Sequence, residues 1–170
     1  MVEEHKVTVF MVKASLIAAV YAAVTIAIAP IAYGPIQFRL SDVLMPLPYI
    51  PYFGWCAVVG LTLGTLIANM ISPYGVWDMI LGSLANLLGG MGAYYARRIP
   101  NKTIGRVVAV IVPVIVVTFL IGYVLLVLII GIPILIAVGG VFIGEAVTAG
   151  VGGYILISRL ERVLGEYGEA

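Results

Sequence analysis

The sequence predicts an all-α integral membrane protein with six transmembrane helices. Apolar residues make up 63% of the 170-residue chain and charged residues only 10%, and the mean hydropathy is +1.19. Soluble domains contain about 45–50% apolar and about 25% charged residues. Since a span needs roughly 20 residues, residues 1–170 are expected to form a single transmembrane domain in the lipid bilayer. The net charge of +1 gives no reason to expect nucleic acid as a partner.

The first three expected helices are separated by residues that break helices. The first covers about residues 10–29 and ends at Pro30, because proline ends a helix at the residue before it. Its apolar stretch is longer than the core of a secretory signal, so we expect it to remain as a span. The second covers residues 41–53 and is short, with three prolines inside it. The third covers residues 54–71.

The last three expected helices are also separated by turn and helix-breaking residues. The fourth covers residues 76–96 and the fifth residues 104–130, with a basic segment, residues 97–102, between them. A Gly-Ile-Pro turn at residues 131–133 precedes the sixth helix, which covers residues 134–164 and has an amphipathic end.

The basic residues predict the orientation of the chain, because short cytoplasmic loops carry an excess of Lys and Arg. With six crossings, eight of the nine basic residues lie on one side, which places both termini in the cytoplasm and the protein in the cell membrane. The eight basic residues on the predicted cytoplasmic side are Lys6, Lys13, Arg97, Arg98, Lys102, Arg106, Arg159 and Arg162. Arg39 alone falls on the opposite, external side.

Six polar residues interrupt the apolar segments in the predicted outer half: Arg39, Asp42, Asn69, Asp78, Asn86 and Glu145. A charged side chain at the bilayer centre costs about 2.5–3.5 kcal/mol on insertion scales, and such residues tend to mark function. We therefore expect these six to line one cavity that opens to the outside.

Simpler roles are open for most of the six. Asp78 could cap the fourth helix, Arg39 and Asp42 could form an ion pair that anchors a loop, and the two asparagines could bond helices together. Glu145 is harder to explain structurally, because a carboxylate deep in an apolar helix needs a partner or a ligand.

Small residues recur every fourth position on the first expected helix, at Ala14, Ala18 and Ala22. Such stripes let helices approach closely in lipid. This one could pack inside the chain or face a partner protein. Aromatic residues, including Phe38 and Trp77, cluster at the outer boundary, where an aromatic belt is expected in any case; stacking on a ligand is the alternative.

Segments 29–42 (APIAYGPIQFRLSD), 68–78 (ANMISPYGVWD), 82–87 (GSLANL) and Gly144-Glu145 resemble the QueT family. Proteins of that family are regarded as substrate-binding S components of energy-coupling factor (ECF) transporters that import queuosine precursors. Asp42 departs from the family pattern, which has Glu there, and Asn86 stands where Thr is common.

The resemblance implies an S-component fold with a short second helix and a lid loop between helices 1 and 2. It also implies that the stripe of Ala14, Ala18 and Ala22 docks on a transmembrane coupling subunit, which two cytoplasmic ATPases drive. The chain has no G-x-x-x-x-G-K-[ST] phosphate loop, so ATP hydrolysis is expected on the partners. We expect no catalytic residue, metal or cofactor in this chain.

The implied ligand is a 7-deazaguanine such as preQ0, preQ1 or queuine. Its N–H edge suits a carboxylate, from Glu145 or Asp78, and its carbonyl suits Arg39, Asn69 or Gln37. Phe38 or Trp77 could stack on the ring. Two alternatives stay open, an S component for a different vitamin-like solute and a self-sufficient secondary transporter. An intramembrane enzyme is disfavoured because the spans offer carboxylates but no histidine.

Overall fold

The computed structural model describes the backbone of residues 2–34 and 37–168 and the side chains of residues 4–34 and 37–164. Every regular element in this part of the chain is helical, which confirms the predicted all-α class. The elements are, in order, α1 (Val2–Ala27), α2 (Ala29–Ala32), η1 (Leu40–Leu44), η2 (Leu47–Tyr49), α3 (Gly54–Ala68), η3 (Asn69–Ile71), α4 (Gly75–Ala96), α5 (Lys102–Val117), η4 (Thr118–Ile129), α6 (Ile134–Glu145), η5 (Ala146–Gly152) and α7 (Gly153–Gly168).

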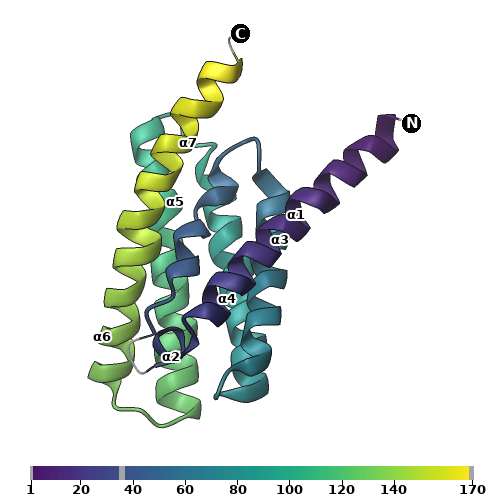
Figure 1. Ribbon diagram of the computed structural model, residues 1–170. Helices are drawn as coiled ribbons and strands as arrows, with labels where there is room; N and C mark the ends of the chain where they lie inside the picture. The colour runs from purple at the N-terminus through teal and green to yellow at the C-terminus, as the bar shows by residue number, and fades with distance from the viewer. Residues whose placement is uncertain (1, 35–36, 169–170) are drawn as a thin grey trace.

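The long helices run side by side along one axis of the molecule (Figure 1). Helix α1 crosses this bundle obliquely and packs on α3, α3 packs on α4, and α4 packs on α5. The last three elements, α6, η5 and α7, form one continuous rod. Both ends of the described chain lie at the same end of the bundle, whereas α2 lies at the opposite end.

Four helices of the described residues are long and apolar enough to cross a membrane: Glu4–Ala27, Gly54–Ile71, Lys102–Ile129 and Ile134–Leu164. These agree closely with four of the predicted segments. Helix α4 has 22 residues, enough to span, but Asp78, Asn86 and several glycines lower its hydropathy. Membrane insertion through several helices is therefore supported, while a total of six crossings stays a prediction.

The predicted short second helix, residues 41–53, is wrong in its detail. This segment contains no α-helix and instead forms two 3₁₀ turns, η1 and η2. Its three prolines explain the difference, because proline cannot donate a backbone hydrogen bond and its ring clashes with the preceding turn. Pro35 and Ile36, in the predicted lid loop, lie outside the described residues, so the lid itself stays a prediction.

Close packing of α1 on α3 corrects the prediction that the alanine stripe docks on a partner. Ala14, Ala18 and Ala22 are each at most 6% exposed, and the first two face glycines of α3. A Cβ added at Gly60 would lie 2.6 Å from the carbonyl oxygen of Ala14, and one at Gly64 would lie 2.8 Å from that of Ala18. The stripe thus serves packing within the chain, the simpler of its two interpretations.

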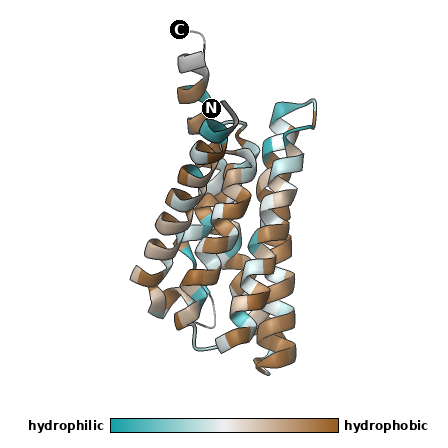
Figure 2. Ribbon diagram, turned by 90° about the vertical axis from the view of Figure 1, so that its right-hand side faces the viewer, coloured by the Kyte–Doolittle hydropathy of each residue, from teal (hydrophilic) through white to brown (hydrophobic). Residues whose placement is uncertain are grey.

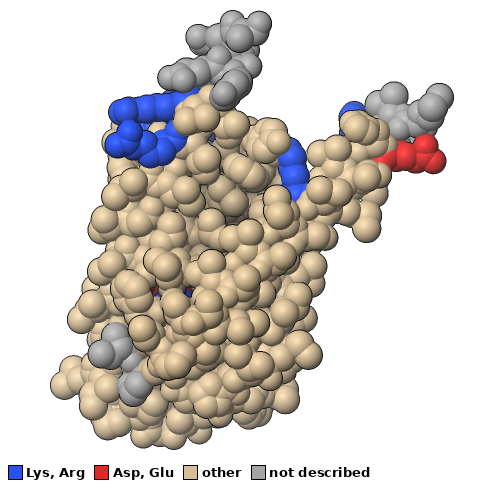
Figure 3. Space-filling model, in the orientation of Figure 1, with Lys and Arg blue, Asp and Glu red and all other residues tan. Residues whose placement is uncertain are grey.

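Charged side chains gather at one end of the molecule. In Figure 3, Lys and Arg atoms lie at the end that carries both termini, and most of the remaining surface on that face is uncharged. Figure 2 shows hydrophobic residues along the helices and hydrophilic ones at the same end. At this basic end Arg106 Nε donates to Glu161 Oε2 at 2.5 Å, between two side chains that are about a quarter exposed.

Candidate functional site

The seven polar residues predicted as candidates are all buried, none more than 3% exposed. We call them the polar cluster: Gln37, Arg39, Asp42, Asn69, Asp78, Asn86 and Glu145. They come from the segment before η1, from η1 and η3, from α4 and from α6. The cluster includes every fully buried charged side chain among the described residues.

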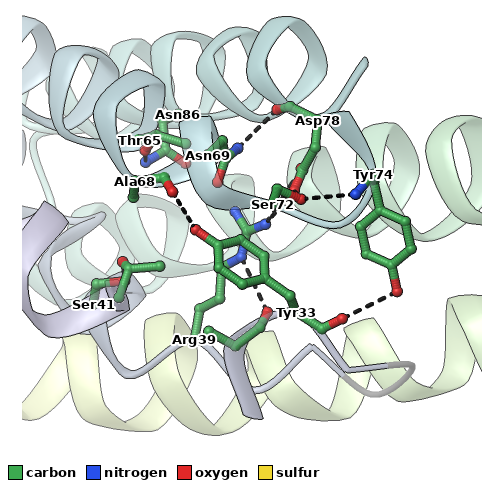
Figure 4. A network of polar contacts seen from close by, with 12 residues as sticks. Tyr33, Arg39, Ser41, Thr65, Ala68, Asn69, Ser72, Tyr74, Asp78 and Asn86 are labelled. Atoms are coloured by element: carbon green, nitrogen blue, oxygen red, sulfur yellow. Dashed lines mark hydrogen bonds and ion pairs between the residues drawn. The ribbon is translucent and has the colours of Figure 1, made fainter. Parts of the chain in front are cut away.

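An ion pair joins the segment before η1 to the first turn of α4. Arg39 Nη2 lies 3.2 Å from Asp78 Oδ2 and 3.3 Å from Oδ1. Arg39 Nε also points to the carbonyl oxygen of Ala32 at 3.4 Å, and Ser72 Oγ donates to Asp78 Oδ2 at 2.5 Å (Figure 4). Asp78 therefore has a structural role beyond that of a helix cap. Arg39 forms its ion pair with Asp78 and not with Asp42, the partner that the sequence suggested.

Two amide side chains connect α4 with the end of α3 and with η3. Asn69 Nδ2 donates to the backbone oxygen of Asp78 at 2.7 Å. Asn86 Nδ2 donates to Thr65 Oγ1 and, at 3.4 Å, to the carbonyl oxygen of Leu61. Both asparagines thus act as interhelical hydrogen-bond donors, the simpler role predicted for them. Asn69 nevertheless keeps an unpartnered acceptor, Oδ1.

Asp42 takes its hydrogen bond from α1, which the sequence did not predict. The hydroxyl of Tyr21 donates to Asp42 Oδ1, and Tyr21 is fully buried. One turn further along α1, Thr25 Oγ1 lies 2.7 Å from Ser41 Oγ. The signal in the sequence was two hydroxyl side chains four residues apart in an apolar helix, which places them on one face.

Glu145 and Asp42 belong to elements that pack together, because η1 contacts η5, which begins directly after Glu145. Glu145 Oε2 and Asp42 Oδ2 are both buried without a hydrogen-bond partner. The backbone changes from α-helix to π-helix immediately after Glu145. Such π-helical turns occur often at functional sites.

Four members of the polar cluster carry a buried polar atom with no partner: Gln37 Nε2, Asp42 Oδ2, Asn69 Oδ1 and Glu145 Oε2. A buried group left unsatisfied costs about 1–3 kcal/mol, so such atoms require an explanation. These three acceptors and one donor are hydrogen-bonding groups that a polar ligand could satisfy; Ser83, Thr118 and Ser158 also carry an unpartnered buried hydroxyl.

Backbone strain accompanies the unpartnered Nε2 of Gln37. Its φ is +45°, in the left-handed region that side chains with a Cβ rarely adopt. Gln37 is 2% exposed, so the strain places a polar side chain in the interior. Strained residues of this kind persist where the surroundings hold them and cluster at binding sites.

Two tyrosines anchor the segment that leads to Gln37. Tyr33 donates its hydroxyl to the carbonyl oxygen of Ala68 at 2.6 Å, and Tyr74 donates to the carbonyl oxygen of Tyr33 at 3.1 Å (Figure 4). Burial raises the pKa of both phenols, so both stay protonated donors at neutral pH. The sequence predicted Tyr33 and Tyr74 as members of an aromatic belt, with ligand stacking as the alternative, and did not predict these two hydrogen bonds.

The two aromatic candidates differ. Phe38 is half-buried next to the cluster residues Gln37 and Arg39. Trp77 is 55% exposed and points away from the buried set, although it precedes Asp78 in sequence. Its position fits the aromatic belt better than the predicted stacking on a ligand.

A separate groove of about 590 Å³ lies between α5 and the rod of α6, η5 and α7. Its lining is apolar apart from Tyr154, and it includes no residue of the polar cluster. On a membrane protein such a face contacts lipid or another helix, so the groove has no chemistry for recognising a polar solute.

Comparison with known proteins agrees with the resemblance in the sequence. A family model described as QueT transporter matches residues 11–162. A segment of 80 residues is 34% identical to the "Queuosine precursor transporter QueT" of Lactococcus lactis subsp. cremoris; the match covers 46% of this chain and 45% of that protein's length. No solved structure matches.

Proposed function

Because the chain belongs to the QueT transporter family, we propose that it is the substrate-binding S component of an ECF importer. In this role it captures a queuosine precursor, a 7-deazaguanine such as preQ0, preQ1 or queuine, from outside the cell. The observation that carries the proposal is the set of unpartnered polar atoms in the polar cluster.

The unpartnered polar atoms of Gln37, Asn69 and Glu145 suit the hydrogen-bonding edges of a guanine-like ring. Its ring N–H groups and exocyclic amine would donate to Glu145 and Asn69, and Gln37 Nε2 would donate to its carbonyl. Of the two predicted stacking partners, Phe38 is half-buried whereas Trp77 is 55% exposed, which favours Phe38. Arg39, Asp78 and Asn86 already bind other groups of the chain, so we assign them to holding the site in place.

The proposed orientation puts the polar cluster toward the outside. Basic residues lie at the end of the bundle that carries both termini, and positive charge favours the cytoplasmic side. Helix α2, which precedes the predicted lid loop, lies at the opposite end. A solute arriving from outside would reach Gln37 and Arg39 without crossing the basic end.

Transport requires an energy source that this chain does not encode. Its sequence contains no phosphate-binding loop of the Walker type. We propose that a transmembrane coupling subunit and two cytoplasmic ATPases supply it. Since the alanines at positions 14, 18 and 22 are buried against α3, the coupling subunit contacts a different surface.

Reconstitution distinguishes this proposal from its alternatives. Proteoliposomes with this chain, the coupling subunit and both ATPases should take up radiolabelled 7-deazaguanine bases when ATP is present on the cytoplasmic side. The chain alone should bind them without ATP-driven accumulation. Accumulation by the chain alone would establish a secondary transporter, and binding of an unrelated vitamin instead of a deazaguanine would establish a different S component.

A further inference from the structure

The apolar groove between α5 and the rod of α6, η5 and α7 adjoins a second depression that is polar and basic. The groove has a volume of about 590 Å³ and includes Tyr154 and Ile155 in its lining. The same two residues line a depression of about 260 Å³, together with Ser158, Arg159 and Arg162. We call this second hollow the basic depression. An apolar and a cationic hollow therefore meet on one side of the molecule.

The basic depression carries positive charge that the described part of the chain does not balance. Arg159 and Arg162 are three residues apart on α7 and so share a helix face. Both are exposed, and neither forms an ion pair with a described residue. Glu161, which lies between them in sequence, is instead paired with Arg106. Two guanidinium groups are thus available to an anion from outside the chain.

Ser158 adds a hydroxyl to the same lining. A serine or threonine within a helix commonly donates to the carbonyl four residues earlier, as Thr148 does to Gly144 at 2.9 Å. The hydroxyl of Ser158 is buried but makes no such bond. A hydroxyl donor beside two guanidinium groups suits a phosphate, whose oxygens accept strong, charge-assisted hydrogen bonds.

The apolar groove has the dimensions of a lipid tail in one leaflet. It follows the rod from Phe142 to Ile155, which is about 20 Å of helix at 1.5 Å per residue. The hydrocarbon of one leaflet is roughly 15 Å thick, half of the bilayer core. Small residues of η5, Ala146 and Gly150, line the groove, and a Cβ added at Gly150 would have no neighbour closer than 3.7 Å.

We propose that the two hollows together bind one anionic phospholipid, with an acyl chain in the apolar groove and the phosphate at Ser158, Arg159 and Arg162. In Figure 3, basic atoms gather at the end of the bundle that carries the C-terminus, which faces the cytoplasm in the proposed orientation. Basic pockets between transmembrane helices on that side of a membrane bind anionic lipid headgroups. The lipid site shares no residue with the polar cluster and therefore goes beyond the proposed function.

Charge complementarity favours a phospholipid over an apolar helix of another subunit. Such a helix could fill the apolar groove, but it would leave Arg159 and Arg162 without a counter-charge. A lipid with a zwitterionic headgroup would bring a positive group close to the two arginines along with its phosphate. An anionic phospholipid matches both the apolar and the cationic hollow.

Native mass spectrometry of the purified full chain tests this site. The protein in detergent is titrated with phosphatidylglycerol or with phosphatidylcholine of the same acyl chains. We expect one phosphatidylglycerol per chain, bound at least about tenfold more tightly than phosphatidylcholine. The double variant Arg159→Gln with Arg162→Gln should lose this preference. Gly150→Leu should weaken the binding of both lipids by about threefold or more, because its side chain displaces methylene groups of the tail from the groove.

The double variant Arg97→Gln with Arg98→Gln is the matched control. It also removes two arginines from the basic end of the bundle, but these lie over the rings of Tyr94 and Tyr95, at 3.8 and 4.9 Å from the ring centroids. Neither arginine lines the basic depression. The preference for phosphatidylglycerol should therefore persist in this variant.

Four results would overturn the lipid site. Equal affinity of the wild type for the two lipids would remove the role of charge, as would an unchanged preference in the variant of Arg159 and Arg162. Unchanged lipid affinity in Gly150→Leu would show that no tail lies in the groove. Lipid-free dimers in place of lipid adducts would assign the groove to a second copy of the chain. Each of these results would leave solute binding in the polar cluster, and so the proposed function, standing.

Discussion

The guanidinium of Arg39 contacts both carboxylate oxygens of Asp78, at 3.2 and 3.3 Å, although 39 residues separate the two in sequence. Both side chains are almost completely buried. Their contact ties the segment before η1 to the beginning of α4, on opposite sides of α3 in the sequence. It therefore fixes the position of Gln37 and Asp42, which flank Arg39, relative to the α4 side of the site.

Asp78→Asn should destabilise the protein strongly. The substitution keeps the size of the side chain but leaves the buried guanidinium of Arg39 without a counter-charge, which costs about 3–5 kcal/mol. Thermal unfolding in detergent, followed by circular dichroism, measures the effect. Glu161→Gln is the control, because its ion pair with Arg106 is about a quarter exposed and such pairs contribute about 0–1 kcal/mol. Equal shifts in Tm for the two variants would contradict this assignment.

Gly60→Ala and Gly64→Ala should separate α1 from α3. Each new methyl group would meet a backbone carbonyl of α1 at 2.6 or 2.8 Å, so the helices must move apart, at a cost of about 1–3 kcal/mol per site. Gly139→Ala in α6 is the matched control, since nothing lies within 4 Å of its added Cβ. We expect lower Tm values for the first two variants and an unchanged or slightly higher one for the control. Three similar Tm values would contradict the close packing of α1 on α3.

Tyr33→Phe and Tyr74→Phe should loosen the segment that carries Gln37. Each loses one hydrogen bond to a backbone carbonyl, worth about 0.5–1.5 kcal/mol. Hydrogen exchange at residues 37–44 should quicken by about two- to tenfold, because local opening becomes easier by that amount. Tyr123→Phe removes the hydroxyl of a half-exposed tyrosine that stacks on Phe119 and should leave this exchange unchanged. Unchanged exchange in both test variants would show that the two hydroxyls do not anchor the segment.

The proposed orientation predicts which turns can be labelled from outside intact cells. In a Cys56→Ala background, Ile130→Cys should react with a membrane-impermeant maleimide, because the turn after η4 lies at the end opposite the termini. Asn101→Cys, between α4 and α5 at the basic end, should react only after permeabilisation. The reverse pattern would invert the topology and move the polar cluster to the cytoplasmic side.

The sequence singled out these polar residues, six of them as the lining of a cavity open to the outside, whereas the structure buries all seven to at most 3% exposure. Polar side chains are expensive in an apolar helix, so the few that occur, such as Asn69 and Glu145, stood out against their surroundings. The partners were harder to predict. Pairing of Arg39 with Asp78 rather than with Asp42 depends on how η1 packs against α4, and no local spacing in the sequence encodes that contact.

Two expectations failed and one residue was missed, each for an identifiable reason. Prolines broke the expected second helix into 3₁₀ turns. The alanine stripe of α1 was predicted to pack inside the chain or to face a partner, because small residues permit close approach to either; the structure shows it packed against glycines of α3. Tyr21 was overlooked because a tyrosine in an apolar helix resembles a core residue until its hydroxyl is seen to bond Asp42.

Mass spectrometry of small molecules that co-purify with the detergent-solubilised protein tests the central claim most directly. The full chain should be purified from cells grown with a 7-deazaguanine base, beside a variant that carries both Asp42→Asn and Glu145→Gln. We predict a deazaguanine mass with the wild type and a strongly reduced signal with the variant. A vitamin of another class on the wild type, or an equal deazaguanine signal on both proteins, would contradict the claim that the polar cluster binds a queuosine precursor.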